Sequence, residues 1–160
     1  ARIVIPFYDS NKELIGFQGR ALDGFVQPKY LTLMMVEDHP KVFGFDTIDE
    51  TKEVYVTEGP FDSTFIDNSI AMCGSDVDLS GYNHIKFTYV YDNEPRNREI
   101  VSKITQSIEK SNKVVIFPTH IREKDINDMV LAGHDVNSLL ESNTYTGLNA
   151  KLKLQTWKKV

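Results

Sequence analysis

Short apolar runs separated by turn residues divide the amino-terminal part of the chain into strand-like segments. Two such runs, residues 2–9 and 14–22, flank the polar triplet Ser10-Asn11-Lys12, and turn residues at that spacing predict a β-hairpin. The next run, residues 27–35, is expected to begin as extended backbone, because the residue before a proline avoids the helical region. This pattern predicts a small antiparallel β unit at the start of the chain.

From residue 53 onward, strand patterns alternate with helix patterns. The longest helical pattern places Ile100, Ile104 and Ile108 on one face, and Pro95 suits its first turn. Such alternation predicts an α/β fold whose mainly parallel sheet is flanked by helices. Strands are predicted at 53–57, 69–73, 84–92 and 113–117, helices at 62–68, 94–110 and 125–133, and further helix beyond residue 134.

The length and composition of the chain indicate what kind of protein it is. The 160 residues suit one domain with a small subdomain, and 41% hydrophobic residues suffice for a core. No apolar run approaches the roughly 20 residues of a membrane helix. Cys73 is the single cysteine, which excludes a disulfide framework and favours a reduced, cytoplasmic protein. The first residues already have a strand pattern, so we expect a piece of a longer protein.

The net charge of −5 is concentrated in the middle of the chain. Residues 31–99 carry fourteen acidic and five basic side chains. An acidic surface can serve solubility alone. Clustered carboxylates can also work on nucleic acid when metal ions offset their charge. The composition leaves both interpretations open.

Acidic residues follow three of the predicted strands. Glu58 follows the first, Asp92 and Glu94 follow another, and Asp125 and Asp128 come after a loop that follows the last. Ligands of open α/β sheets gather at the carboxyl ends of the strands. Crowded carboxylates repel one another unless a cation lies between them, and hard oxygen ligands suit Mg²⁺. The pattern favours a magnesium-dependent phosphoryl-transfer site.

Each acidic residue also has a simpler explanation. Asp62 fits the first turn of a helix, where a negative charge is favourable. The segment 92–94 fits a surface turn, and Asp125 fits a helix N-cap. The metal-site hypothesis depends on the acidic residues lying together at one sheet edge.

Several segments resemble a known protein family. The segment VTEGPFDS (56–63) resembles the first motif of the TOPRIM domain, and YVYDNE (89–94) resembles the second, with Glu94 in place of the usual aspartate. EKDINDMVLAG (123–133) resembles the third acidic stretch. GFQGR (16–20) followed by PKYL (28–31) is similar to the region before TOPRIM in bacterial-type replicative DNA primases, most of all those of tailed bacteriophages. Relatives carry a helix where residues 73–84 are short, so we expect that helix to be reduced.

The resemblance implies roles for individual side chains. Asp92 and Glu94 would be the primary ligands of Mg²⁺ or Mn²⁺, as two ions, and Glu58 would be a further ligand or a base. The second-rank ligands would be Asp62, Asp125 and Asp128. The residues expected to bind template or triphosphate phosphates are Arg20, Lys29 and Lys41.

The resemblance also implies a domain division and an activity. Residues 1–50 would belong to the amino-terminal subdomain of the primase core, 51–133 to the TOPRIM domain and 134–160 to a helical extension. The enzyme would make RNA primers from ribonucleoside triphosphates on single-stranded DNA, with a replicative helicase as partner. The alternatives are a TOPRIM nuclease, which the GFQGR and PKYL segments disfavour, and a non-catalytic scaffold, which the full set of acidic residues disfavours.

Overall fold

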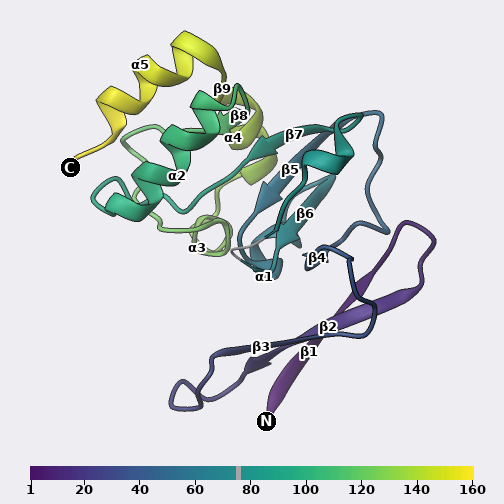
Figure 1. Ribbon diagram of the computed structural model, residues 1–160. Helices are drawn as coiled ribbons and strands as arrows, with labels where there is room; N and C mark the ends of the chain where they lie inside the picture. Colours follow the sequence, from purple (N-terminus) through teal and green to yellow (C-terminus); the bar gives the residue numbers. More distant parts are fainter. Residues whose placement is uncertain (75–76) are drawn as a thin grey trace.

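The computed structural model describes residues 1–74 and 77–160 and contains two sheets (Figure 1). The smaller sheet is antiparallel, with strands in the order β1 (Arg2–Tyr8), β2 (Leu14–Ala21) and β3 (Tyr30–Met34). The hairpin predicted from the first two apolar runs is therefore confirmed.

The larger sheet has six strands in the order β4-β6-β5-β7-β8-β9. Its four central strands run parallel, and the edge strands β4 and β9 pair antiparallel. The predicted fold class, a mainly parallel α/β sheet preceded by a small antiparallel unit, is confirmed. The strands are β4 (Val42–Phe43), β5 (Glu53–Thr57), β6 (Ser69–Met72), β7 (Lys86–Tyr89), β8 (Lys113–Val115) and β9 (Thr144–Tyr145).

Helices cover both faces of the larger sheet (Figure 1). On one face, α2 (Arg98–Glu109) and α5 (Gly147–Trp157) bury the predicted isoleucine stripe against Val114 and Ile116. On the other face, α3 (Ile126–Leu131) and α4 (Val136–Ser142) pack over Val90, Val115 and Phe117. No helix in the described part of the chain is long and apolar enough to cross a membrane.

Some predicted boundaries were wrong. The helix predicted at 62–68 is the short α1 (Pro60–Ser63), and residue 68 has a positive φ of 53° that ends any helical path. Pro95 precedes α2 instead of lying in its first turn, because the side chain of Asn97 caps the helix by accepting hydrogen bonds from the backbone N–H groups of Glu99 and Ile100. The proposed domain division remains a prediction, and β4 and β9, from outside 51–133, both pair within the larger sheet.

The smaller sheet packs against the larger one through one face. Ile5 and Phe7 are buried there beside Phe43 and Phe61. The buried amide of Gln18 donates to the hydroxyl of Thr32, at 3.0 Å, and to the carbonyl of Cys73, at 3.2 Å. These contacts hold β2 and β3 beside the carboxyl ends of the larger sheet's strands.

The described part of the connection from β6 to β7 contains little regular structure. Residues 75–76 of the segment expected to carry a reduced helix lie outside the described residues. The rest of the connection contains the single turn η1 (Ser80–Tyr82). One region of the sheet beside β7 is therefore covered by a short loop segment instead of a full helix.

Candidate active site

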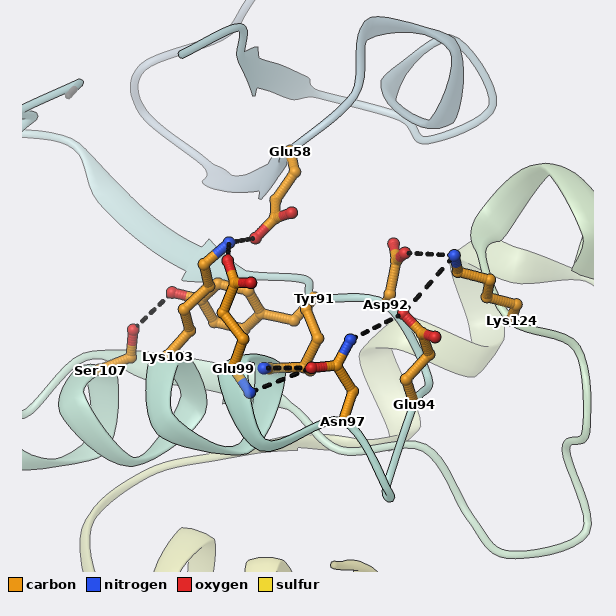
Figure 2. Close-up of polar contacts among 10 residues, drawn as sticks. Glu58, Tyr91, Asp92, Glu94, Asn97, Glu99, Lys103, Ser107 and Lys124 are labelled. Carbon is orange, nitrogen blue, oxygen red and sulfur yellow. Dashed lines mark hydrogen bonds and ion pairs between the residues drawn. The ribbon is translucent and has the colours of Figure 1, made fainter. Parts of the chain in front are cut away.

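The parallel pairing of β5 and β7 brings two predicted acidic residues to the same sheet edge. Val56 is in register with Tyr89, and the N–H of Val90 donates to the carbonyl of Val56 at 2.8 Å. Glu58 lies two residues beyond Val56, and Asp92 lies three beyond Tyr89. Both side chains therefore leave the sheet at its carboxyl edge, as Figure 2 shows.

A short turn places Asp62 next to the start of α3. Pro60 opens α1 directly after Gly59. A β-carbon at residue 59 would lie only 3.2 Å from Oδ2 of Asp62, so glycine gives that carboxylate its space. The other carboxylate oxygen of Asp62 accepts the backbone N–H of Asn127 at 3.1 Å. Asp125 caps α3 by accepting the N–H of Asp128 at 2.8 Å, as its predicted N-cap role requires.

The carboxylates lie close enough to change one another's pKa. The pKa of Asp92 is raised to about 6, mainly by burial; Lys124 opposes the rise, and the negative charges of Asp62, Glu58 and Asp125 add to it. Burial also raises the pKa of Asp62, which the hydrogen bond from the backbone of residue 127 opposes. Deprotonating these groups together has an electrostatic cost that a bound cation would relieve.

Two lysines lie among the carboxylates. Lys103 of α2 contacts Glu58 at 2.8 Å and Glu99 at 3.1 Å. Lys124 lies 3.7 Å from Asp92 and 3.5 Å from Glu94 (Figure 2). The negative charges of Glu94 and Asp92 raise the pKa of Lys124. Burial lowers the pKa of Lys103, but its hydrogen bonds to Glu58 and Glu99 and their charges raise it overall.

Most of these carboxylates and lysines line an open cavity of about 610 Å³ between the two sheets, the carboxylate cavity. Gln18 and Tyr30 of the smaller sheet form part of its wall. Carboxylates and lysines from segments far apart in the sequence therefore line the same cavity. The charged residues that line it are Lys29, Glu58, Asp62, Asp92, Lys103, Lys124 and Asp125.

Four predicted site residues lie outside that lining. Glu94 lines a neighbouring cavity and reaches the site through Lys124. Asp128 acts on the site through its charge, which raises the pKa of Asp62. The guanidinium of Arg20 lies over the ring of Phe61, with 4.6 Å from Cζ to the centroid. Lys41 precedes β4, where its carbonyl accepts the N–H of Cys73.

Comparisons with known proteins show which folds this chain shares. No family model matches the chain. The chain is 32% identical to the DNA primase of Enterobacteria phage T4 over 165 aligned residues. The alignment covers 99% of this chain and 48% of that protein. The RNA polymerase domain of Mycobacterium tuberculosis primase DnaG, in complex with a double-stranded DNA oligomer with a 6-nucleotide overhang, matches at a TM-score of 0.69 and 19% identity. That match covers 90% of this chain and 53% of the other.

A second solved structure, the Aquifex aeolicus primase with its zinc-binding and RNA polymerase domains, matches at a TM-score of 0.67 and 22% identity. The match covers 90% of this chain and 41% of the other. The chain has the fold of a DnaG-type primase catalytic core. This confirms the resemblance predicted from the sequence. The chain spans about half the length of the curated primase that it matches.

The acidic side of this primase fold suits a hard divalent cation in the chemistry of its donors, which are all carboxylate oxygens. Within the described residues, no three acidic, histidine or cysteine side chains are arranged to hold one ion as they lie. The ammonium groups of Lys103 and Lys124 lie directly against Glu58, Asp92 and Glu94. A cation bound by these carboxylates would therefore displace the lysines, which would become available for phosphate oxygens.

Sequence reasoning missed Lys103 and Lys124. Lys124 directly precedes Asp125, so its position beside the predicted third acidic stretch was an available signal. Lys103 lies one helical turn after Glu99 on α2 and is half-buried. Its contact with Glu58 joins residues 45 positions apart, and no local pattern encodes that contact.

Proposed function

We propose that this chain is the catalytic part of a DNA primase, which joins ribonucleotides into short RNA primers on single-stranded DNA. The supporting observation is the carboxylate cavity on a fold shared with DnaG catalytic cores, in a chain 32% identical to part of a phage DNA primase. In the reaction, a 3′-hydroxyl attacks the α-phosphate of a ribonucleoside triphosphate and pyrophosphate leaves.

The carboxylates of this site would hold Mg²⁺ or Mn²⁺, as two ions. Asp92 and Glu94 would be the primary ligands, Glu58 would be a further ligand or a base, and the second-rank ligands would be Asp62, Asp125 and Asp128. Bound ions of this kind supply positive charge to the transferring phosphoryl group and to the leaving oxygen. The burial that raises the pKa of Asp92 also limits water at the site, which strengthens electrostatic interactions there.

The lysines of the cavity would bind the triphosphate. Lys124 lies against two proposed ligands, and Lys103 lies against a third. Their ammonium groups can donate to phosphate oxygens once the carboxylates are neutralised. Glu58 would help to position the attacking hydroxyl or accept its proton.

The smaller sheet would hold the template side of the site. Lys29 lines the cavity from the segment before β3, and its ammonium lies 5.7 Å from the ring centroid of Tyr30. Arg20 lies next to α1, where its guanidinium can bind two phosphate oxygens at once. Lys41 would contribute a further phosphate contact. A single-stranded template would thus pass between the two sheets.

The other partners and the cellular setting follow from this proposal. A replicative helicase would recruit the primase, and both would act in the host cytoplasm if the protein is encoded by a phage. Residues 1–50 would form part of the amino-terminal subdomain, 51–133 the TOPRIM domain and 134–160 a carboxyl-terminal extension.

Primer synthesis tests the proposal directly. Protein that contains this chain is incubated with single-stranded DNA, labelled ribonucleotides and Mg²⁺. We expect short labelled RNA, which is lost in the Asp92→Asn variant and kept in Glu37→Gln, because Glu37 is an exposed carboxylate in the segment after β3. Release of short nucleotides from labelled DNA, with no RNA made, would instead indicate a nuclease.

A further inference from the structure

The last helix of the chain is hydrogen-bonded to the loop that carries two proposed metal ligands. Residues 90–97 join β7 to α2, and Asp92 and Glu94 lie within this loop. At the end of α5, which packs beside α2 (Figure 1), the indole N–H of Trp157 donates to Oδ1 of Asn93 at 3.0 Å. The acceptor is therefore the residue that separates the two acidic side chains.

Both polar atoms of the Asn93 side chain have partners. The amide nitrogen donates to the carbonyls of Ile121, at 3.0 Å, and Glu123, at 3.1 Å, while the oxygen accepts the indole N–H. The backbone N–H of the same residue donates to the carbonyl of Lys124 at 2.6 Å. A side-chain amide supplies two donors and an acceptor, which a carboxylate or an apolar side chain does not. Asn93 thus joins its own loop, the segment before α3 and the end of α5 at one point.

Trp157 is held in place independently of this bond. Its side chain is 4% exposed and belongs to the core that α2 and α5 form with β8. Two residues further on, the backbone N–H of Lys159 donates to the carbonyl of Pro95 at 2.8 Å. Asp92 lines the carboxylate cavity, whereas Asn93 and Trp157 line the neighbouring cavity. The indole is therefore a fixed donor that supports the loop from outside the carboxylate cavity.

We propose that Trp157 is a positioning residue of the metal site, because its bond to Asn93 keeps Asp92 and Glu94 at one spacing. The inference rests on the proposed function, since it concerns ligands of the same site. Two carboxylates that repel each other move apart when the backbone that carries them is free. A loop that is fixed before the cation arrives avoids that ordering cost and binds the ion more tightly. Residues 134–160 therefore contribute to metal affinity through this contact.

The Trp157→Phe variant removes the indole N–H and keeps an aromatic ring in the core. Leu154→Val is the matched control, because Leu154 is a buried residue of the same helix and the same core and has no polar group in its side chain. The control loosens the packing of α5 but leaves the bond to Asn93 in place. Circular dichroism and thermal melting of both variants verify that they fold.

Calorimetric titration with Mn²⁺ compares the metal affinity of these variants. Because a single hydrogen bond makes a modest net contribution, we expect Trp157→Phe to bind Mn²⁺ about two- to tenfold more weakly than the wild type. Leu154→Val should bind it as the wild type does. In an Asn93→Ala background the acceptor is absent, so Trp157→Phe should cause no further loss. Unchanged affinity in Trp157→Phe, an equal loss in Leu154→Val, or a full further loss in the Asn93→Ala background would overturn the inference.

Hydrogen exchange without metal tests the same contact independently of the proposed function. NMR in EDTA follows the backbone N–H of Asn93, which is bonded to Lys124, and that of Val90, which is bonded to Val56 and serves as control. We expect Trp157→Phe to speed exchange at Asn93 about two- to tenfold and to leave Val90 unchanged. If the wild type binds no Mn²⁺, the proposed function fails, but the exchange still decides whether Trp157 fixes the loop. Unchanged exchange at Asn93 would refute the inference, and so would an equal increase at both positions.

The wild type alone provides a further check that needs no variant. The chain has a single tryptophan, so its indole N–H gives one NMR signal. We expect this proton to exchange with solvent much more slowly than that of a free indole, because it is buried and bonded to Asn93. Exchange as fast as in a free indole would refute the bond and the inference with it.

Discussion

The burial of Asp92 among like charges predicts that neutralising it stabilises the metal-free protein. Its pKa is raised from the ordinary value of 3.8 to about 6, so the folded state holds the proton more tightly than the unfolded chain. A carboxylate of this kind costs stability as the pH rises through the interval between the two values and carries the full cost above pH 6. The Asp92→Asn variant has the same shape and no such charge.

The size of the effect follows from the shift. About two pKa units correspond to about 2.7 kcal/mol, at 1.36 kcal/mol for each unit. Part of the Asp92 carboxylate is exposed to water, and screening reduces the effective cost to about 1–2 kcal/mol. For a chain of this length, that corresponds to a rise in melting temperature of roughly 2–8 °C for Asp92→Asn.

Thermal melting in EDTA at a series of pH values measures this difference. We expect Asp92→Asn to melt above the wild type at pH 7.5, with the gap closing as the pH falls from 6 to 4. The Glu37→Gln control removes an exposed carboxylate and should melt like the wild type throughout. An Asp92→Asn variant less stable than the wild type at pH 7.5 would show that burying the charge of Asp92 does not cost stability as argued.

Three further substitutions test individual contacts. Asn93→Ala removes a side chain that donates to two backbone carbonyls and accepts a hydrogen bond from the indole N–H of Trp157 at 3.0 Å. Leaving those partners unpaired should lower the free energy of unfolding by about 2–3 kcal/mol in urea titrations. A loss below about 0.5 kcal/mol would contradict this role. Gly59→Ala should leave the melting temperature nearly unchanged but lower Mn²⁺ affinity about three- to tenfold, because the new β-carbon presses on Asp62; unchanged affinity in calorimetry would show that Asp62 does not depend on that space. Lys103→Met should weaken tripolyphosphate binding in Mg²⁺ about five- to tenfold, since it deletes one ammonium group from the cavity, and equal binding would remove Lys103 from the phosphate site.

The sequence predicted the fold well where the pattern was local. The strand at 53–57 matches β5 in both bounds, because its β-branched residues stand between clear breaks. The isoleucine stripe of α2 is buried as predicted, with Ile104 only 2% exposed. Periodicity failed where a single side chain sets the boundary, as at Asn97, whose capping hydrogen bonds start α2 after Pro95.

The acidic residues of the cavity and Lys29 were predictable from the sequence, whereas Lys103 and Lys124 were missed. Glu58 and Asp92 follow strands, and parallel strands end at one edge of a sheet. The position of Lys103 depends on how α2 packs against β8, and a packing contact of this kind leaves no repeat or motif in the sequence. Asp125 caps α3, as one interpretation of the sequence predicted, and it also lines the cavity that holds Glu58 and Asp92; its role as a metal ligand stays a prediction.

Calorimetric titration of Mn²⁺ into the wild type and into an Asp92→Asn, Glu94→Gln double variant tests the metal-site proposal most directly. The proposal predicts clear binding by the wild type, retained by Glu37→Gln, and at least a tenfold loss in the double variant, whose circular dichroism stays native. Equal Mn²⁺ affinity in the wild type and the double variant would contradict it.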